Sequence, residues 1–133
     1  MSGKKILVVE DEAVQLTSVA RRLKSAGYEV VGARDGASAI STARKELPDL
    51  VLLDLGLPAG DGFTVQKRLQ MLIQTTTIPV IVASARDPAG NRDAALKAGA
   101  VAYLQKPLET DVLLKAIGDV LGTSESNSPA NPA

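Results

Sequence analysis

The chain has 133 residues, no net formal charge at pH 7, no cysteine and no histidine. This length suits one domain, and the two missing residue types exclude disulfides, thiolate or imidazole metal sites and a phosphohistidine on this chain. The neutral charge balance and the presence of only two tyrosines and one phenylalanine argue against direct nucleic-acid binding. No apolar stretch is long enough to span a membrane, so we expect a cytoplasmic protein.

Strand-like and helix-like segments alternate five times along the chain. Expected in chain order are strands at 6–9, 28–33, 50–53, 80–83 and 101–104 and helices at 16–23, 39–47, 65–73, 89–98 and 113–121. The apolar runs have the composition of strands buried on both faces, and most helical segments repeat their apolar residues about one helical turn apart. Segment 89–98 is short, rich in alanine and only weakly amphipathic. Gly27 and Gly99 stand where the first and fourth helices should end, and Pro48 follows the second.

This alternation predicts an α/β fold with a parallel sheet, right-handed crossovers and helices on both faces. The second strand contains a charged residue and suits an edge. We therefore expect a flavodoxin-like, doubly wound five-stranded sheet of order 2-1-3-4-5 with five helices. Residues 1–122 would form this domain. Residues 123–133 are rich in Ser, Asn and Pro and would be a disordered tail or the start of a linker.

Polar residues follow four of the apolar runs. Glu10 and Asp11 end the first run, Asp54 the third and Ser84 the fourth, and Lys106 follows the fifth. Parallel strands end at one edge of a sheet, so these groups should converge near the point where the strand order reverses. The three carboxylates would repel one another, and a hard cation with oxygen ligands, Mg²⁺ or Mn²⁺, would relieve the repulsion.

Each of these residues, taken alone, could have a common structural role instead. Asp54 could be a turn residue, and Glu10 and Asp11 could cap the following helix. Ser84 and Lys106 are common residue types at strand ends and surface loops. Their joint occurrence at equivalent positions of neighbouring strands favours a site that neutralises a phosphoryl group with a cation, an ammonium and a hydroxyl.

The chain resembles the receiver domain of bacterial two-component response regulators, in particular stand-alone, chemotaxis-regulator-like receivers. The resemblance covers residues 4–121. The motifs that carry it are residues 6–12 with the acid pair, residues 52–58 with Asp54, residues 61–63, residues 82–85 with Ser84, and residues 99–107 with Lys106.

The resemblance implies that Asp54 accepts a phosphoryl group in a phosphorelay. Glu10, Asp11 and Asp54, with the backbone carbonyl of Gly56, would hold the metal ion. The first acid is Glu rather than the more usual Asp, and we expect metal binding to tolerate the extra methylene. The phosphoryl donor would be a phosphohistidine on a sensor histidine kinase or a histidine phosphotransfer protein.

Further roles implied by the resemblance concern switching. Ser84 and Lys106 would contact the phosphoryl group, Tyr103 would turn inward on activation, and the Lys106–Pro107 bond would be cis. The face formed by the fourth helix, the fifth strand and the fifth helix would then change shape and recruit a downstream protein. Such a chain assists its own phosphorylation and dephosphorylation but is not a dedicated enzyme.

Other interpretations compete with a stand-alone receiver. The chain could be a receiver cut from a larger regulator or hybrid kinase. A magnesium-dependent phosphatase of the haloacid dehalogenase type would need a second acid two residues after the nucleophile, where Gly56 stands. A nucleotide-binding module would need a phosphate-binding glycine loop, which residues 60–62 do not match. A degenerate receiver that acts by contact alone is disfavoured because the acceptor groups are present.

Overall fold

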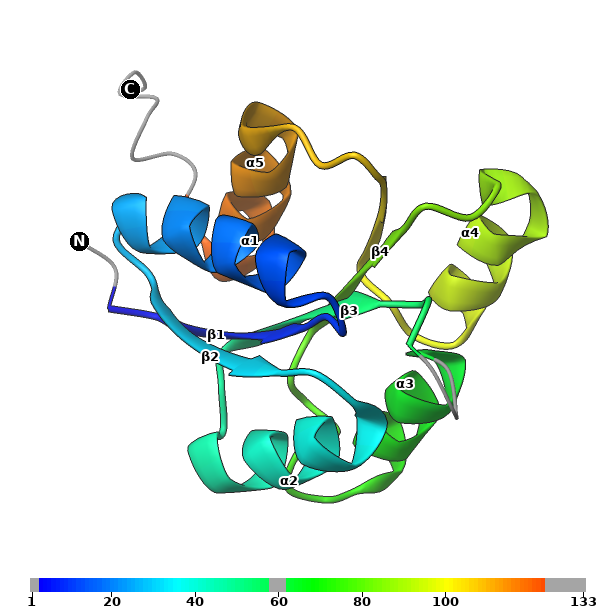
Figure 1. Ribbon diagram of the computed structural model, residues 1–133. Coiled ribbons are helices and arrows are strands. Elements are labelled where there is room, and N and C mark those ends of the chain that lie inside the picture. The colour runs from blue at the N-terminus through cyan, green and yellow to red at the C-terminus, as the bar shows by residue number, and fades with distance from the viewer. Residues whose placement is uncertain (1–2, 58–61, 124–133) are drawn as a thin grey trace.

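The computed structural model describes residues 3–57 and 62–123 (Figure 1). Strands and helices alternate in the predicted order. The elements are β1 (Lys5–Val9), α1 (Ala13–Ser25), β2 (Glu29–Ala33), α2 (Gly36–Glu46), β3 (Leu50–Asp54), α3 (Gly62–Met71), β4 (Val80–Ser84), α4 (Pro88–Lys97), β5 (Ala102–Gln105) and α5 (Thr110–Leu121). Within these described ranges, no helix has both the length and the apolar character needed to cross a bilayer.

The strands form one parallel sheet in the order β2-β1-β3-β4-β5, which confirms the predicted flavodoxin-like topology. β2 is an edge strand, as its charged residue indicates, and β5 is the other edge. The order reverses between β1 and β3. In sheets of this kind the crevice beyond the carboxyl ends at such a reversal is the usual ligand site.

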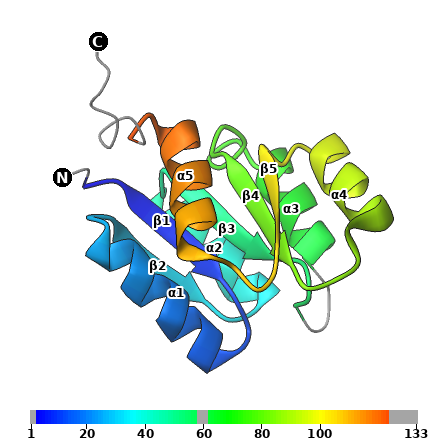
Figure 2. The ribbon, with the colours of Figure 1, turned by 90° about the horizontal axis from the view of Figure 1, so that it is seen from above.

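Two apolar layers enclose the sheet. Alternate strand residues point to opposite faces, so Ile6 and Val8 pack with α1 and α5, whereas Leu7 and Val9 pack with α2, α3 and α4. In Figure 1, α1 and α5 lie on one side of the sheet and α2 and α3 on the other, and Figure 2 shows the same strands from above. Every residue of β3 and β4 is buried, which explains why these strands are apolar on both faces.

Helix ends follow the predicted signals in most places. The Asp35 side chain accepts a hydrogen bond from the Ser38 backbone N–H at 2.8 Å and caps α2. Gly27 (φ 98°) follows the end of α1, and Gly99 (φ 108°) follows the end of α4. A Cβ on Gly99 would meet only the end of the exposed Gln70 side chain, which can move aside, so it is the backbone angle that favours glycine here.

Several predicted element ends are wrong. Four residues, Tyr28, Leu47, Ala98 and Val101, each lie one position outside the strand or helix predicted to contain them, and the third helix ends two residues early. The apolar spacing places Ile73 in the third helix, but α3 ends at Met71 and Ile73 is 90% exposed. The cause is Thr75, which is buried and donates a hydrogen bond from its hydroxyl to the Leu69 carbonyl at 2.6 Å, so the chain folds back on the helix end. Val101 likewise lies outside β5 and is half exposed.

α4 is irregular and weakly packed, in agreement with its poor amphipathic pattern. Ala89 and Gly90 have non-helical backbone angles. Among the described residues of α4, Ala95 is the one that is fully buried. A second attachment comes from Gln66 of α3, whose fully buried side chain donates a hydrogen bond to the Ala95 carbonyl at 2.9 Å.

Leu47 ends α2 in the left-handed conformation (φ 47°, ψ 61°), with Pro48 next in the chain. A side chain in this conformation costs roughly 1–2 kcal/mol, and Leu47 is 56% exposed, so it recovers little by burial. We expect Leu47→Gly to raise the free energy of unfolding by about 0.5–1 kcal/mol, because glycine relieves the strain but adds chain entropy. Urea denaturation would measure the gain. Leu47→Ala keeps the strain and should show none, so equal gains in both variants would contradict this account.

Candidate phosphoryl-transfer site

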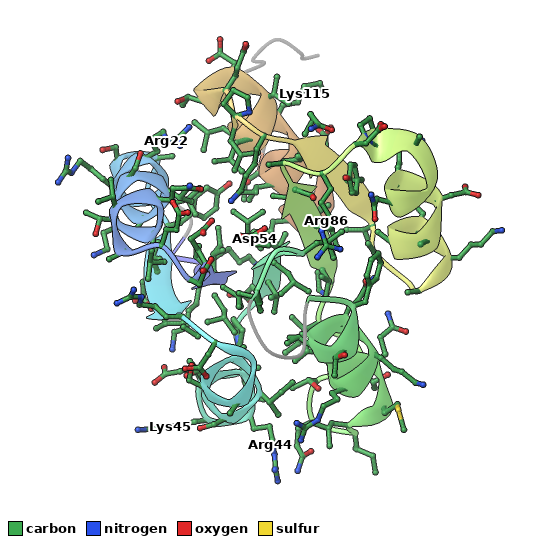
Figure 3. All side chains as sticks on the ribbon, turned by 45° about the vertical axis from the view of Figure 1, so that its right-hand side comes forward. Arg22, Arg44, Lys45, Asp54, Arg86 and Lys115 are labelled. Carbon is green, nitrogen blue, oxygen red and sulfur yellow. The ribbon has the colours of Figure 1, made fainter. Side chains whose placement is uncertain are left out.

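Polar side chains from four strand ends meet at one edge of the sheet. Asp54 and Ser84 are the last residues of β3 and β4, Glu10 directly follows β1, and Lys106 directly follows β5. Figure 3 shows Asp54 near the centre of this edge, with Arg86 on the neighbouring loop after β4. The parallel register that pairs Val9 with Leu53 and Asp54 with Ala83 brings these ends together.

Three carboxylates form a compact acidic group. Glu10, Asp11 and Asp54 each offer an oxygen, and these oxygens lie within 4.8 Å of one another. Glu10 and Asp54 are 4% and 9% exposed, whereas Asp11 is partly exposed. Hard oxygen donors at this spacing, open to solvent on one side, fit a Mg²⁺ ion that keeps several of its waters. The residues that the sequence assigns to the metal site are therefore close enough to bind one cation together.

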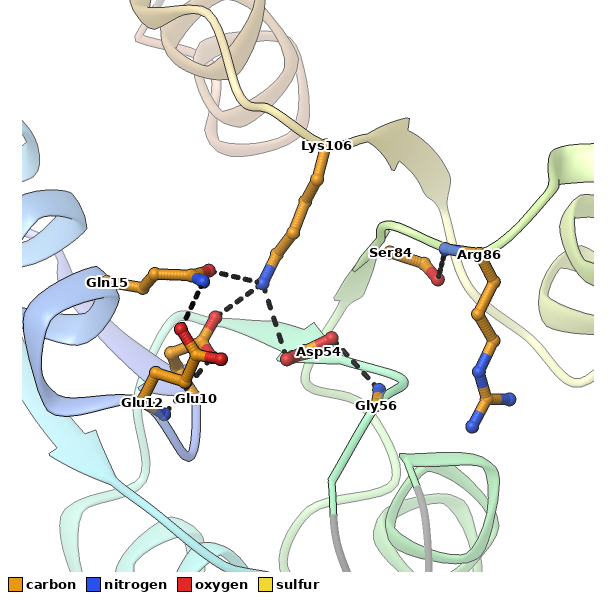
Figure 4. Close-up of polar contacts among 8 residues, drawn as sticks. All are labelled: Glu10, Glu12, Gln15, Asp54, Gly56, Ser84, Arg86 and Lys106. Carbon is orange, nitrogen blue, oxygen red and sulfur yellow. Dashed lines mark hydrogen bonds and ion pairs between the residues drawn. The ribbon is translucent and has the colours of Figure 1, made fainter.

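Lys106 places its ammonium among the acids. Its Nζ lies 2.6 Å from Glu10 Oε1 and 3.3 Å from Asp54 Oδ2 (Figure 4). Burial alone would lower the pKa of Lys106, but the hydrogen bond to Glu10 and the charges of Asp54 and Glu10 outweigh burial and raise that pKa. Lys106 therefore remains a cation at neutral pH, and it lies closer to Glu10 than to Asp54.

Burial is the main influence on the pKa of the Glu10 carboxyl group. It disfavours the charged carboxylate and, together with the negative charge of Asp54, raises the pKa of Glu10, although the hydrogen bond from Lys106 opposes the rise. A divalent cation beside this carboxylate would favour its charged form. The acidic group thus has the chemistry of a site that a divalent cation would stabilise.

Asp54 is fixed by its own loop. The backbone N–H of Gly56 donates to Asp54 Oδ1 at 2.9 Å, so one carboxylate oxygen faces the backbone and the other faces Lys106. Gly56 is thereby placed beside Asp54, as the sequence predicts, while a role for its carbonyl as a metal ligand stays a prediction. Pro58 and residues 59–61, part of the predicted motif, lie outside the described residues.

The predicted switch residues occupy two different environments. Ser84 is fully buried, and its hydroxyl accepts a hydrogen bond from the Arg86 backbone N–H at 2.9 Å on the β4 side of Asp54 (Figure 4). Tyr103 packs against the layer formed with α2, α3 and α4, and its hydroxyl is already buried, with no hydrogen-bond partner among the described residues. The Lys106–Pro107 peptide bond is cis, as expected.

The sequence did not predict two residues that contact the site, Gln15 and Arg34. Gln15 accepts a hydrogen bond from Lys106 Nζ at 2.9 Å and donates one to Glu12 at 2.6 Å. Arg34 donates two hydrogen bonds, at 3.0 and 2.8 Å, to the backbone carbonyl of Asp11. A polar residue in the first turn of α1, just before the apolar stripe, is the sequence signal that could have identified Gln15.

Residues 6–118 match the family described as response regulator receiver domain. The chain belongs to this family. It is 33% identical over 117 residues to protein PilH of Pseudomonas aeruginosa, a match that covers 88% of this chain and 97% of PilH. It is 40% identical over 112 residues to the response regulator PleD of Caulobacter vibrioides, but there the match covers 84% of this chain and only 24% of PleD.

Solved receiver structures have the same fold. A putative response regulator from Chloroflexus aurantiacus superimposes with a TM-score of 0.85 at 33% identity, covering 90% of this chain and 98% of that chain. The receiver domain of the sensor histidine kinase PA1611 from Pseudomonas aeruginosa, with a magnesium ion coordinated in its active-site cleft, gives 0.83 at 32% identity and the same coverages, 90% and 98%. Receiver domains take phosphate from histidine kinases, and they are signalling phosphoacceptors rather than dedicated enzymes.

Proposed function

We propose that this receiver domain accepts a phosphoryl group on Asp54 in a reaction that depends on Mg²⁺, and that the donor is a phosphohistidine of a sensor histidine kinase or a histidine phosphotransfer protein. The observation that carries the proposal is the position of Asp54 between a group of carboxylates that could hold a cation and the ammonium of Lys106. Its carboxylate shares the acidic group with Glu10 and Asp11, and its Oδ2 lies 3.3 Å from the Lys106 ammonium.

The chemistry requires little beyond positioning and neutralisation of charge. An Asp54 oxygen attacks phosphorus, the phosphorus–nitrogen bond to histidine breaks, and the imidazole leaves with the bonding electron pair. Glu10, Asp11 and Asp54 would hold the cation, which when bound neutralises phosphoryl oxygens. Mn²⁺, with similar ligand preferences, would serve in its place. Lys106 would donate a hydrogen bond to a phosphoryl oxygen from the opposite side.

Switching follows from the added charge. The phosphoryl group gives Ser84 a stronger acceptor than its present contact with the Arg86 backbone. Movement of Ser84 would pull the loop after β4 and change the packing around Tyr103 and α4. The face formed by α4, β5 and α5 would thereby change shape and bind a downstream protein. Because the hydroxyl of Tyr103 is buried already, we expect the surroundings of this side chain to change more than its own orientation.

Metal removal tests the proposed function directly. We expect incubation with acetyl phosphate and Mg²⁺ to add one phosphoryl group, detected by intact-mass spectrometry, and we expect excess EDTA to prevent the addition. Mn²⁺ should restore it. Addition of Ca²⁺, a larger ion with more ligands, serves as a control for general ionic effects. Equal labelling with and without chelator would contradict a metal-dependent acceptor site.

A further inference from the structure

The Lys106 ammonium makes two hydrogen bonds and one longer ion pair. Nζ lies 2.6 Å from Glu10 Oε1, 2.9 Å from Gln15 Oε1 and 3.3 Å from Asp54 Oδ2. The two shorter contacts are to residues of the β1–α1 segment, and the longest is to Asp54. The ammonium is therefore held on the side of the acid pair, and the lysine stem that carries it is only 14% exposed.

Gln15 is itself held in one orientation. Its Nε2 donates to Glu12 Oε1 at 2.6 Å, and only the opposite end of the carboxamide can accept from Lys106. The backbone N–H of Glu12 donates to Glu10 Oε2 at 3.3 Å, so the same short segment also contacts the second oxygen of Glu10. Figure 4 shows these contacts as a ring that joins Glu10, Glu12, Gln15 and Lys106.

From this ring we infer that Gln15 is a positioning residue that keeps the Lys106 ammonium beside Glu10, where it competes with the divalent cation for the acid pair. The inference rests on the proposed metal site. In the metal-free protein, Lys106 neutralises part of the charge that Mg²⁺ would neutralise. In the metal-bound protein, the same ammonium is a positive charge near the ion and repels it.

Gln15 weakens Mg²⁺ binding in two ways. Its hydrogen bond stabilises the metal-free arrangement, in which Lys106 and Glu10 are paired, and it keeps a positive charge close to the bound ion. Loss of the Gln15 carbonyl should therefore strengthen Mg²⁺ binding. A purely structural role in α1 predicts the opposite sign or no change, because a disturbed helix would misplace Glu10 and Asp11.

Isothermal titration calorimetry with Mg²⁺ and the unphosphorylated chain provides the test. Gln15→Met keeps the length of the side chain and a good helix former but removes both hydrogen bonds. We expect the dissociation constant for Mg²⁺ to fall about threefold to tenfold, as for one hydrogen bond to a charged group that is partly open to solvent. Ser18→Met, on an exposed position of the same helix, should leave the constant unchanged.

The variant Lys106→Met separates the inferred role from any other effect of Gln15. If Gln15 acts through Lys106, the change Gln15→Met should have no effect on Mg²⁺ affinity in the Lys106→Met background. An effect that persists there would overturn the inference, as would an unchanged or weaker affinity in the single variant. If the unaltered chain bound no Mg²⁺ at all, the proposed metal site would fail together with the inference.

Discussion

Replacing Asp54 by asparagine is expected to reduce labelling by acetyl phosphate and Mg²⁺ to the level seen without phosphodonor. Asparagine has nearly the same shape, and its carbonyl oxygen can still accept the hydrogen bond from the Gly56 N–H. The amide is not a nucleophile toward phosphorus, and it removes one of the three negative charges of the acidic group. Intact-mass spectrometry would quantify the loss.

Asp93→Asn is the matched control for the Asp54 variant. Asp93 lies on α4 with a side chain that is 76% exposed and an ion pair to Lys97, so its carboxylate is lost without any change at the strand ends. This variant should be labelled like the unaltered chain. A label that persisted in Asp54→Asn would show that the acceptor is another residue and would remove the assignment to Asp54.

Alanine at Gly62 is expected to lower the free energy of unfolding by about 1–3 kcal/mol, the usual cost of forcing extra volume into a packed position. Gly62 begins α3, and a Cβ there would lie 2.5 Å from the Leu55 Cα and 2.6 Å from the Asp54 carbonyl oxygen. Alanine is normally the better helix residue by roughly 0.5–1 kcal/mol. The clash is with backbone, which cannot move aside as a flexible side chain can, so it should outweigh that gain.

Urea denaturation of Gly62→Ala beside Gly56→Ala tests this expectation. Gly56 belongs to the same loop, but its added Cβ would lie 3.5 Å from Asp54 Oδ1, an ordinary van der Waals distance. We expect the midpoint to fall for Gly62→Ala and to change little for Gly56→Ala. Equal midpoints for the two variants would show that the loop between β3 and α3 relaxes freely around position 62.

The convergence of the acids could be predicted because it depends on topology alone. Apolar runs of strand length set five parallel strands, and a residue that ends such a run must lie at the carboxyl edge of the sheet. Asp54 and Glu10 follow their runs directly, so an error of one residue in a strand boundary would not have moved them from that edge. Their positions are therefore insensitive to the boundary errors seen at Val101 and Ile73.

The contacts of Lys106 could not be predicted in the same way. Four rotatable bonds separate its ammonium from the backbone, and the choice between Glu10 and Asp54 depends on distances of a few tenths of an ångström and on Gln15. The left-handed conformation of Leu47 could not be predicted either, because leucine rarely adopts it and a residue before proline normally takes an extended conformation.

The attachment of α4 has a mechanical consequence. Releasing this helix costs the burial of Ala95, the packing of the partly buried Leu96 and the hydrogen bond from Gln66, a small part of what unfolding the whole domain would cost. The molecule thus combines a stiff sheet, which keeps the reacting groups in register, with one compliant element next to β5. If Asp54 accepts a phosphoryl group as proposed, the added charge would shift α4 more readily than the sheet, because α4 is the less firmly packed of the two.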